Sequence, residues 1–177
     1  MRAAWWVARR ELASASSSLP TYAAAAIFLC LAALFFNSAL DETREASLRS
    51  FIEPLDFLVL VLVPMFAARA LADERRTGTA EILFTLPAAP WSIVAGKFAA
   101  VVVLGLATLA TTLVFPFALE QVGSPDRGPM ASQYLGAVLL VCAMAAIGVA
   151  TSSLSSSAAL AGTTALVVTL ALWFAGS

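Results

Sequence analysis

The sequence predicts an all-α integral membrane protein, a polytopic helical bundle of about five transmembrane helices. The first reason is composition, because 61% of the 177 residues are hydrophobic and 12% are charged, whereas a soluble domain is about half apolar and about a quarter charged. The second is that the apolar residues gather in five stretches, each close to the roughly 20 residues that a spanning helix needs. The third is that every Lys and Arg avoids the centres of these stretches, where each would cost roughly 2.5–3.5 kcal/mol. We therefore expect a single transmembrane domain over residues 1–177.

The first 18 residues predict an amphipathic helix that lies along the membrane surface. Trp5, Ala8 and Leu12 share one helical face, while Arg2 and Arg9 lie roughly opposite. Tryptophan suits headgroup depth, and arginine points toward water or anionic lipid. Such a helix either only anchors the chain and sets its orientation, or forms an elbow that flanks a transport domain. The residues alone leave both interpretations open.

Five spans follow this helix. Pro20 suits the first turn of the first span, where a missing backbone N–H costs nothing. Pro64 and Pro116 predict kinks in the second and third spans. The spans are expected over about residues 20–40, 55–71, 93–119, 134–154 and 158–174.

The positive charges predict the orientation of the chain, because Lys and Arg accumulate in cytoplasmic loops. The side that holds the N-terminus carries seven of them: Arg2, Arg9, Arg10, Arg69, Arg75, Arg76 and Lys97. The other side carries three: Arg44, Arg49 and Arg127. We therefore expect a multi-pass protein of the inner (cytoplasmic) membrane, with its N-terminus in the cytoplasm.

The residue inventory argues against an enzyme. The chain has no histidine, which is the commonest general base and a common metal ligand. Its two cysteines, Cys30 and Cys142, lie within apolar runs, where they are expected to pack as small hydrophobes. The net charge of −1 gives no indication of a nucleic-acid partner. We expect no catalytic, cofactor or metal site in this chain.

The loop between the second and third spans, residues 72–92, predicts a short cytoplasmic helix. Gly78 ends the preceding span, and Thr79 is a suitable N-cap. Glu81 falls in the first turn, where its charge suits the helix dipole, and Pro87 ends the helix. The helix is either an ordinary turn packed at the headgroup layer or a docking helix that fits a groove on a cytoplasmic partner.

Several segments taken together carry a family resemblance. They are ARREL at Ala8–Leu12, DERRTGTAEILFTLP at Asp73–Pro87, WSIVAGKF at Trp91–Phe98, GSPDRGPMASQYLG at Gly123–Gly136 and IGVATSSLSSS at Ile147–Ser157. In these segments the chain resembles the permease subunits of ABC-2 type ABC transporters, particularly the gliding-motility-like branch. The resemblance implies a six-span permease that dimerises with a second copy or a paralogue and binds two cytoplasmic ATPase subunits. ATP and Mg would bind those partners, since this chain has no GxxxxGK[ST] loop.

The resemblance also implies site residues. The loop helix becomes the coupling helix, at about Thr79–Leu86, with Lys97 closing the loop at the membrane surface. The expected ATPase-docking residues are Glu74, Arg75, Arg76, Gly78, Thr79, Glu81, Ile82, Leu83, Phe84 and Leu86. Hydroxyl-bearing residues of the third and fifth spans are candidates for lining the transport pathway: Thr108, Thr111, Thr112, Thr163, Thr164 and Thr169. The alternative for each threonine is a hydroxyl that bonds back to its own helix.

One departure from the family pattern is expected to matter. The five expected spans leave out the sixth helix of these permeases, which predicts a fragment, a truncated reading frame or a split subunit. The leading prediction is an ABC transporter permease, more often an exporter in this class. The alternative is a structural or lipid-organising membrane protein, or an inactive permease fragment.

Overall fold

The computed structural model describes residues 2–43, 49–76, 90–122, 127–155 and 157–176, and these residues form helices and no strands. The prediction of an all-α membrane protein is therefore confirmed. The helices are α1 (Arg2–Ser16), α2 (Leu19–Thr43), α3 (Arg49–Arg76), α5 (Pro90–Thr111), α6 (Val114–Val122), α7 (Arg127–Leu154) and α8 (Ala158–Gly176).

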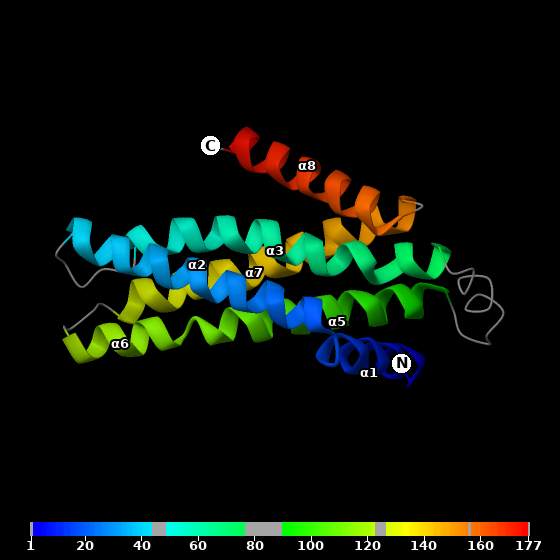
Figure 1. Ribbon diagram of the computed structural model, residues 1–177, viewed down its shortest axis with the longest axis horizontal. Helices are drawn as coiled ribbons and strands as arrows, with labels where there is room; N and C mark the ends of the chain where they lie inside the picture. Colours follow the sequence, from blue (N-terminus) through cyan, green and yellow to red (C-terminus); the bar gives the residue numbers. More distant parts are fainter. Residues whose placement is uncertain (1, 44–48, 77–89, 123–126, 156, 177) are drawn as a thin grey trace.

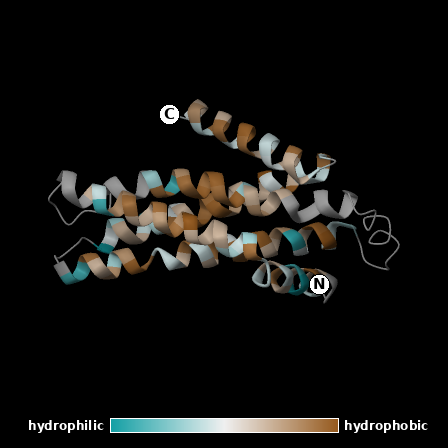
Figure 2. Cartoon of the chain, viewed as in Figure 1, coloured by the Kyte–Doolittle hydropathy of each residue, from teal (hydrophilic) through white to brown (hydrophobic). Residues whose placement is uncertain are grey.

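Four helical segments of the described chain are long and apolar enough to cross a membrane. They are Leu19–Ala39, Pro90–Gln121, Arg127–Leu154 and Ala158–Gly176. The fifth expected span corresponds to a shorter apolar segment, Pro54–Ala68, inside the long helix α3. Figure 2 shows the hydrophobic residues filling the middle of the bundle, with hydrophilic positions near its ends.

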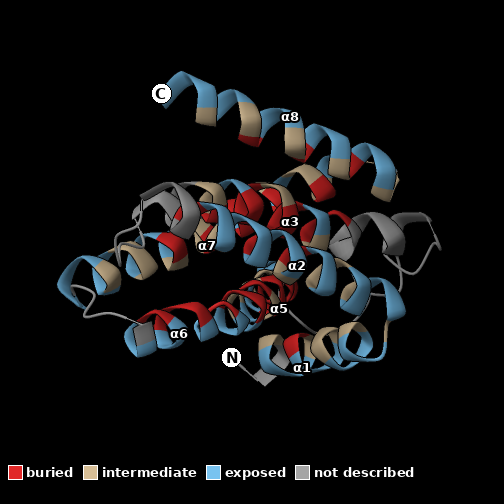
Figure 3. Ribbon diagram, turned by 60° about the vertical axis from the view of Figure 1, so that its left-hand side comes forward, coloured by how far each residue is buried: buried red, intermediate tan, exposed pale blue. Residues whose placement is uncertain are grey.

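Helices α3 and α7 form the centre of the bundle. Helix α8 packs against both of them on one side, while α5 packs against both on the other (Figure 1). Helix α2 lies on α3, and α1 lies on the outside of α5. Burial follows this order, because 39% of the apolar windows of α5 and α7 is buried, against 11% for α2 and 17% for α8 (Figure 3). Helices α2 and α8 therefore present most of their apolar surface outward.

Small residues allow the two central helices to approach closely. A Cβ atom on Gly148 of α7 would lie 2.5 Å from the Cβ of Ala67 and 3.3 Å from the Cα of Pro64, both in α3. One turn further along α7, the hydroxyl of Ser152 donates a 3.1 Å hydrogen bond to the carbonyl of Ala68. Lipid is as apolar as a leucine side chain, so close packing and interhelical hydrogen bonds hold membrane helices together.

The third expected span, 93–119, is not one continuous helix. Helix α5 ends at Thr111 and α6 begins at Val114. Pro116 has no N–H to donate to the carbonyl four residues earlier, which belongs to Thr112. That carbonyl instead accepts a 3.0 Å bond from the backbone N–H of Phe115 and a 3.1 Å bond from the hydroxyl of Tyr134 in α7. By contrast, α3 continues as one helix through Pro64, where the sequence also predicted a kink.

Candidate functional site

The predicted coupling helix lies outside the described residues. Residues 77–89 belong to the part of the chain that the structure does not describe, and of the expected docking residues only the backbone of Glu74, Arg75 and Arg76 is described, at the end of α3. The docking prediction therefore stays a prediction. The structure does describe the helices on either side of this loop, and what packs against them defines the candidate site.

Helix α1 packs along α5 at the end of the bundle where α5 begins (Figure 1). The contact is close, because a Cβ on Gly96 would lie 2.6 Å from the carbonyl oxygen of Ala4 and 2.9 Å from the Cβ of Val7. Only glycine at this position of α5 leaves room for the α1 backbone. Ala8 is also buried here, with 7% of its surface exposed.

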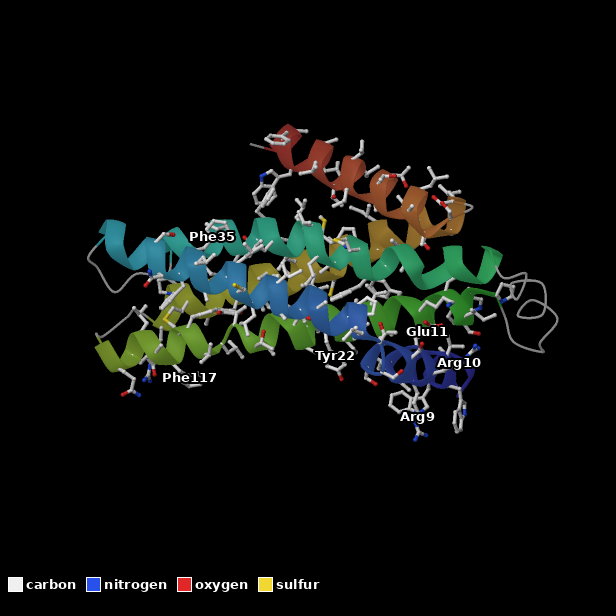
Figure 4. The ribbon with its side chains drawn as sticks, in the orientation of Figure 1. Arg9, Arg10, Glu11, Tyr22, Phe35 and Phe117 are labelled. Atoms are coloured by element: carbon white, nitrogen blue, oxygen red, sulfur yellow. The ribbon has the colours of Figure 1, made fainter. Side chains whose placement is uncertain are left out.

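A buried ion pair joins the two helices next to this contact. The Nζ atom of Lys97 lies 2.8 Å from Oε1 of Glu11, and the two side chains are 1% and 29% exposed. Figure 4 labels Glu11 on α1, beside α5. A buried ammonium is costly without a nearby anion, so the position of α1 against α5 is what makes a lysine acceptable here. Lys97 is thus covered by α1 and paired with Glu11, while its expected place at the membrane surface stays a prediction.

The outer face of α1 differs from the predicted one. Trp5 was expected on the same apolar face as Ala8, yet it is 67% exposed and Trp6 is 63% exposed. The close approach at Gly96 admits only the small side chains of α1, so the indoles turn outward. The guanidinium of Arg9 lies 5.8 Å from the Trp6 ring centroid, within cation–π range. Trp91, in the first turn of α5, is 71% exposed.

The six candidate pathway threonines do not converge on one site. Three are buried and three are exposed: Thr108, Thr112 and Thr169, against Thr111, Thr163 and Thr164. Each hydroxyl donates to a backbone carbonyl three or four residues earlier in the chain. Helices α5 and α8 lie on opposite sides of the α3–α7 centre (Figure 1). Their role in a pathway stays a prediction, and the geometry matches the alternative of helix-bonded hydroxyls.

Thr112 is the one candidate with a described side-chain partner on another helix. Its hydroxyl lies 3.3 Å from that of Tyr134, next to the backbone break between α5 and α6. Sequence reasoning missed Tyr134, and it also missed Glu11 as the partner of Lys97. The only available signal for Glu11 was its place in the ARREL segment, which says nothing about what the carboxylate contacts.

The described residues bring together no group of three or more His, Cys, Asp or Glu side chains that could hold a metal ion. Charged groups do form single ion pairs here: Lys97 with Glu11, and Arg127 with Glu120 across the α6–α7 connection, at 3.0 Å. The described site is therefore a packing and ion-pair junction between helices.

Comparison with known proteins gives one family. The model of the family described as "ABC-2 family transporter protein" matches residues 5–177, which include most of α1 and every later described helix. A search of curated proteins found no match.

Proposed function

Since the chain belongs to the ABC-2 family of transporter proteins, we propose that it is the permease of an ATP-driven transporter and couples to a separate cytoplasmic ATPase subunit. The observation that carries this proposal is the family match over residues 5–177, on a chain whose described helices are long and apolar enough to span a membrane. ATP and Mg would bind the ATPase, and this chain would supply the membrane path.

The proposed route of coupling starts at residues 79–86. These residues dock on the ATPase, with Glu81 and the basic pair Arg75 and Arg76 as polar contacts. A displacement of this loop would reach the bundle through the end of α3 and the start of α5, which flank it. The packing supports this route, since both helices contact α7 and α5 also carries α1. Work is done only if the ATPase binds the two states of the permease with different affinity.

The break between α5 and α6 supports a second part of the mechanism. A span interrupted at residues 112–113 has a joint at which its two halves can change their relative angle. The Tyr134 hydroxyl on the Thr112 carbonyl would hold this joint in one state.

The remaining parts of the proposal follow the family resemblance and the charge distribution. Transport is outward, a second permease copy or a paralogue completes the pathway, and the protein resides in the inner membrane. The N-terminus and residues 72–92 face the cytoplasm, because that side carries seven of the ten Lys and Arg residues.

Co-purification tests the docking proposal. The chain is co-expressed with the ATPase subunit from the same operon and purified through a tag on the permease. Wild type is compared with Glu81→Arg and with Gln121→Arg, which adds a positive charge to an exposed position of α6, beyond the joint from α5. We expect the ATPase to co-purify with wild type and with Gln121→Arg, and to be lost with Glu81→Arg.

Three results would count against the proposal. Equal capture by all three chains would move the docking contact away from Glu81. If no ATPase is captured by wild type, while a six-span relative captures its own, the chain is an incomplete permease. If neither captures an ATPase, the structural or lipid-organising alternative leads.

A further inference from the structure

The outer face of α1 combines two exposed tryptophans with two exposed arginines. We define this surface by Trp5, Trp6, Arg9 and Arg10, all of which are exposed. Figure 4 shows Arg9 projecting from α1 on the side away from the bundle. No other described part of the chain places arginine and tryptophan side chains together in this way.

The ion pair with α5 leaves this surface purely cationic. Glu11 is the only acidic residue of α1, and its carboxylate is bound to Lys97 at 2.8 Å. Among the described residues, Arg9 and Arg10 have no carboxylate within ion-pair distance. Lys97 therefore neutralises the one negative charge of α1, and the positive charge of this helix faces outward.

Three contacts hold α1, and with it this surface, against α5 and α2. Gly96 admits the α1 backbone, Glu11 binds Lys97, and the Tyr22 hydroxyl of α2 donates a 2.7 Å hydrogen bond to the carbonyl of Ser16 at the end of α1. The last contact sets the angle at which α1 leads into the apolar helix α2. Helix α1 is thereby held beside the starts of α2 and α5, both of which are apolar enough to span a membrane.

From this geometry we infer that the outer face of α1 is a binding surface for anionic lipid headgroups. Tryptophan is most stable at headgroup depth, and arginine beside it forms charge-assisted hydrogen bonds with phosphate. A soluble anion would bring no apolar part for the two indoles to contact, whereas a phospholipid brings both a phosphate and acyl chains. Helices of this composition bind membrane surfaces through apolar burial and attraction to anionic lipid together.

Fluorescence quenching in lipid nanodiscs tests this inference without an ATPase, so its failure would leave the permease proposal untouched. The full chain carries Trp91→Phe and Trp173→Phe, so that Trp5 and Trp6 are the only emitters. Brominated phosphatidylglycerol is titrated against brominated phosphatidylcholine. Each basic residue near an anionic surface contributes roughly a fivefold preference, so the two arginines predict a preference of roughly 25-fold at low salt. Added salt should reduce it.

The matched variants separate charge from packing. Arg9→Gln with Arg10→Gln is expected to lower the preference by about tenfold or more, and the corresponding pair of lysine substitutions to keep most of it. Arg127→Gln removes a charge that is 83% exposed at the start of α7 and should change nothing. If the double glutamine variant does not fold, each single substitution should cost roughly fivefold. Equal quenching by both lipids, an unchanged glutamine variant, or competition by free glycerol phosphate at constant ionic strength would overturn the assignment.

Discussion

Removal of the Glu11 carboxylate should destabilise the protein far more than its place near the N-terminus suggests. The Lys97 side chain is 1% exposed, so its ammonium cannot turn to water when the carboxylate 2.8 Å away is lost. Breaking a buried pair by removing one partner costs about 3–5 kcal/mol, and we expect a loss in this range for Glu11→Gln. The amide keeps the shape of the side chain, so the loss reports on charge.

Removal of the other partner, the Lys97 ammonium, should cost less folding stability. Glu11 is 29% exposed, so its carboxylate regains water when Lys97→Met removes the cation. We expect a loss of about 1–3 kcal/mol, the range for a hydrogen bond to a charged group. The double variant removes both charges and nearly keeps both volumes, which is often close to neutral. With both single losses at the low ends of their ranges and a neutral double variant, the cycle should give a coupling free energy of at least about 4 kcal/mol.

Unfolding in mixed micelles, followed by far-ultraviolet circular dichroism and tryptophan fluorescence, measures these free energies. The pair Glu120 and Arg127 is a matched control, because its atoms are 3.0 Å apart but its side chains are 33% and 83% exposed. Exposed pairs couple by about 0.2–1 kcal/mol. A coupling for Glu11 and Lys97 no larger than that of the control would refute the reasoning from burial.

The remaining predictions concern the contacts of α7. Gly148→Ala should destabilise the bundle by about 1–3 kcal/mol, because the new Cβ would lie 2.5 Å from that of Ala67. Gly136→Ala is the control, because a Cβ there meets nothing within 4 Å. In the same unfolding assay it should be neutral or stabilise α7 by up to about 1 kcal/mol. Equal losses for both would show that the contact between α3 and α7 is looser than described. Tyr134→Phe should cost about 1 kcal/mol, because the Thr112 carbonyl loses one of its two hydrogen bonds. The variant should also loosen the joint between α5 and α6, which spin labels on the two helices would detect as a broader distance distribution; an unchanged distribution would mean that Tyr134 does not hold the joint.

The fold class could be predicted because it depends on hydrophobicity summed over consecutive residues of the chain. Lipid cannot hydrogen-bond to backbone groups, so a chain that is mostly apolar over stretches of about 20 residues must be helical there. The expected spans fall on described helices, although the second matches only the shorter apolar segment Pro54–Ala68 and the third is interrupted at residues 112–113. Both prolines predicted a distortion of their spans. The helix is interrupted next to Pro116, whereas α3 stays continuous through Pro64. Proline removes a hydrogen bond in both cases, and its neighbours decide how the helix responds.

The candidate sites were less predictable, because they depend on which faces meet. Threonine in an apolar span can line a path or bond to the backbone one turn earlier, and only the structure shows that all six hydroxyls do the latter. The face of α1 was misjudged for a related reason. Amphipathic periodicity treated Trp5 and Ala8 as equivalent apolar residues, while packing on Gly96 distinguishes them by size.

The sequence by itself determined that this protein is helical, crosses a membrane and belongs to a transporter family, because hydrophobicity and motif order are properties of neighbouring residues along the chain. Tertiary structure alone decided that Glu11 neutralises Lys97, that Gly148 brings α7 onto α3, and that α1 turns its arginines and tryptophans outward. The partners in these contacts are separated by about half of the chain. The energies of burial and ion pairing arise only where such distant residues come into contact, so no local sequence pattern could predict them.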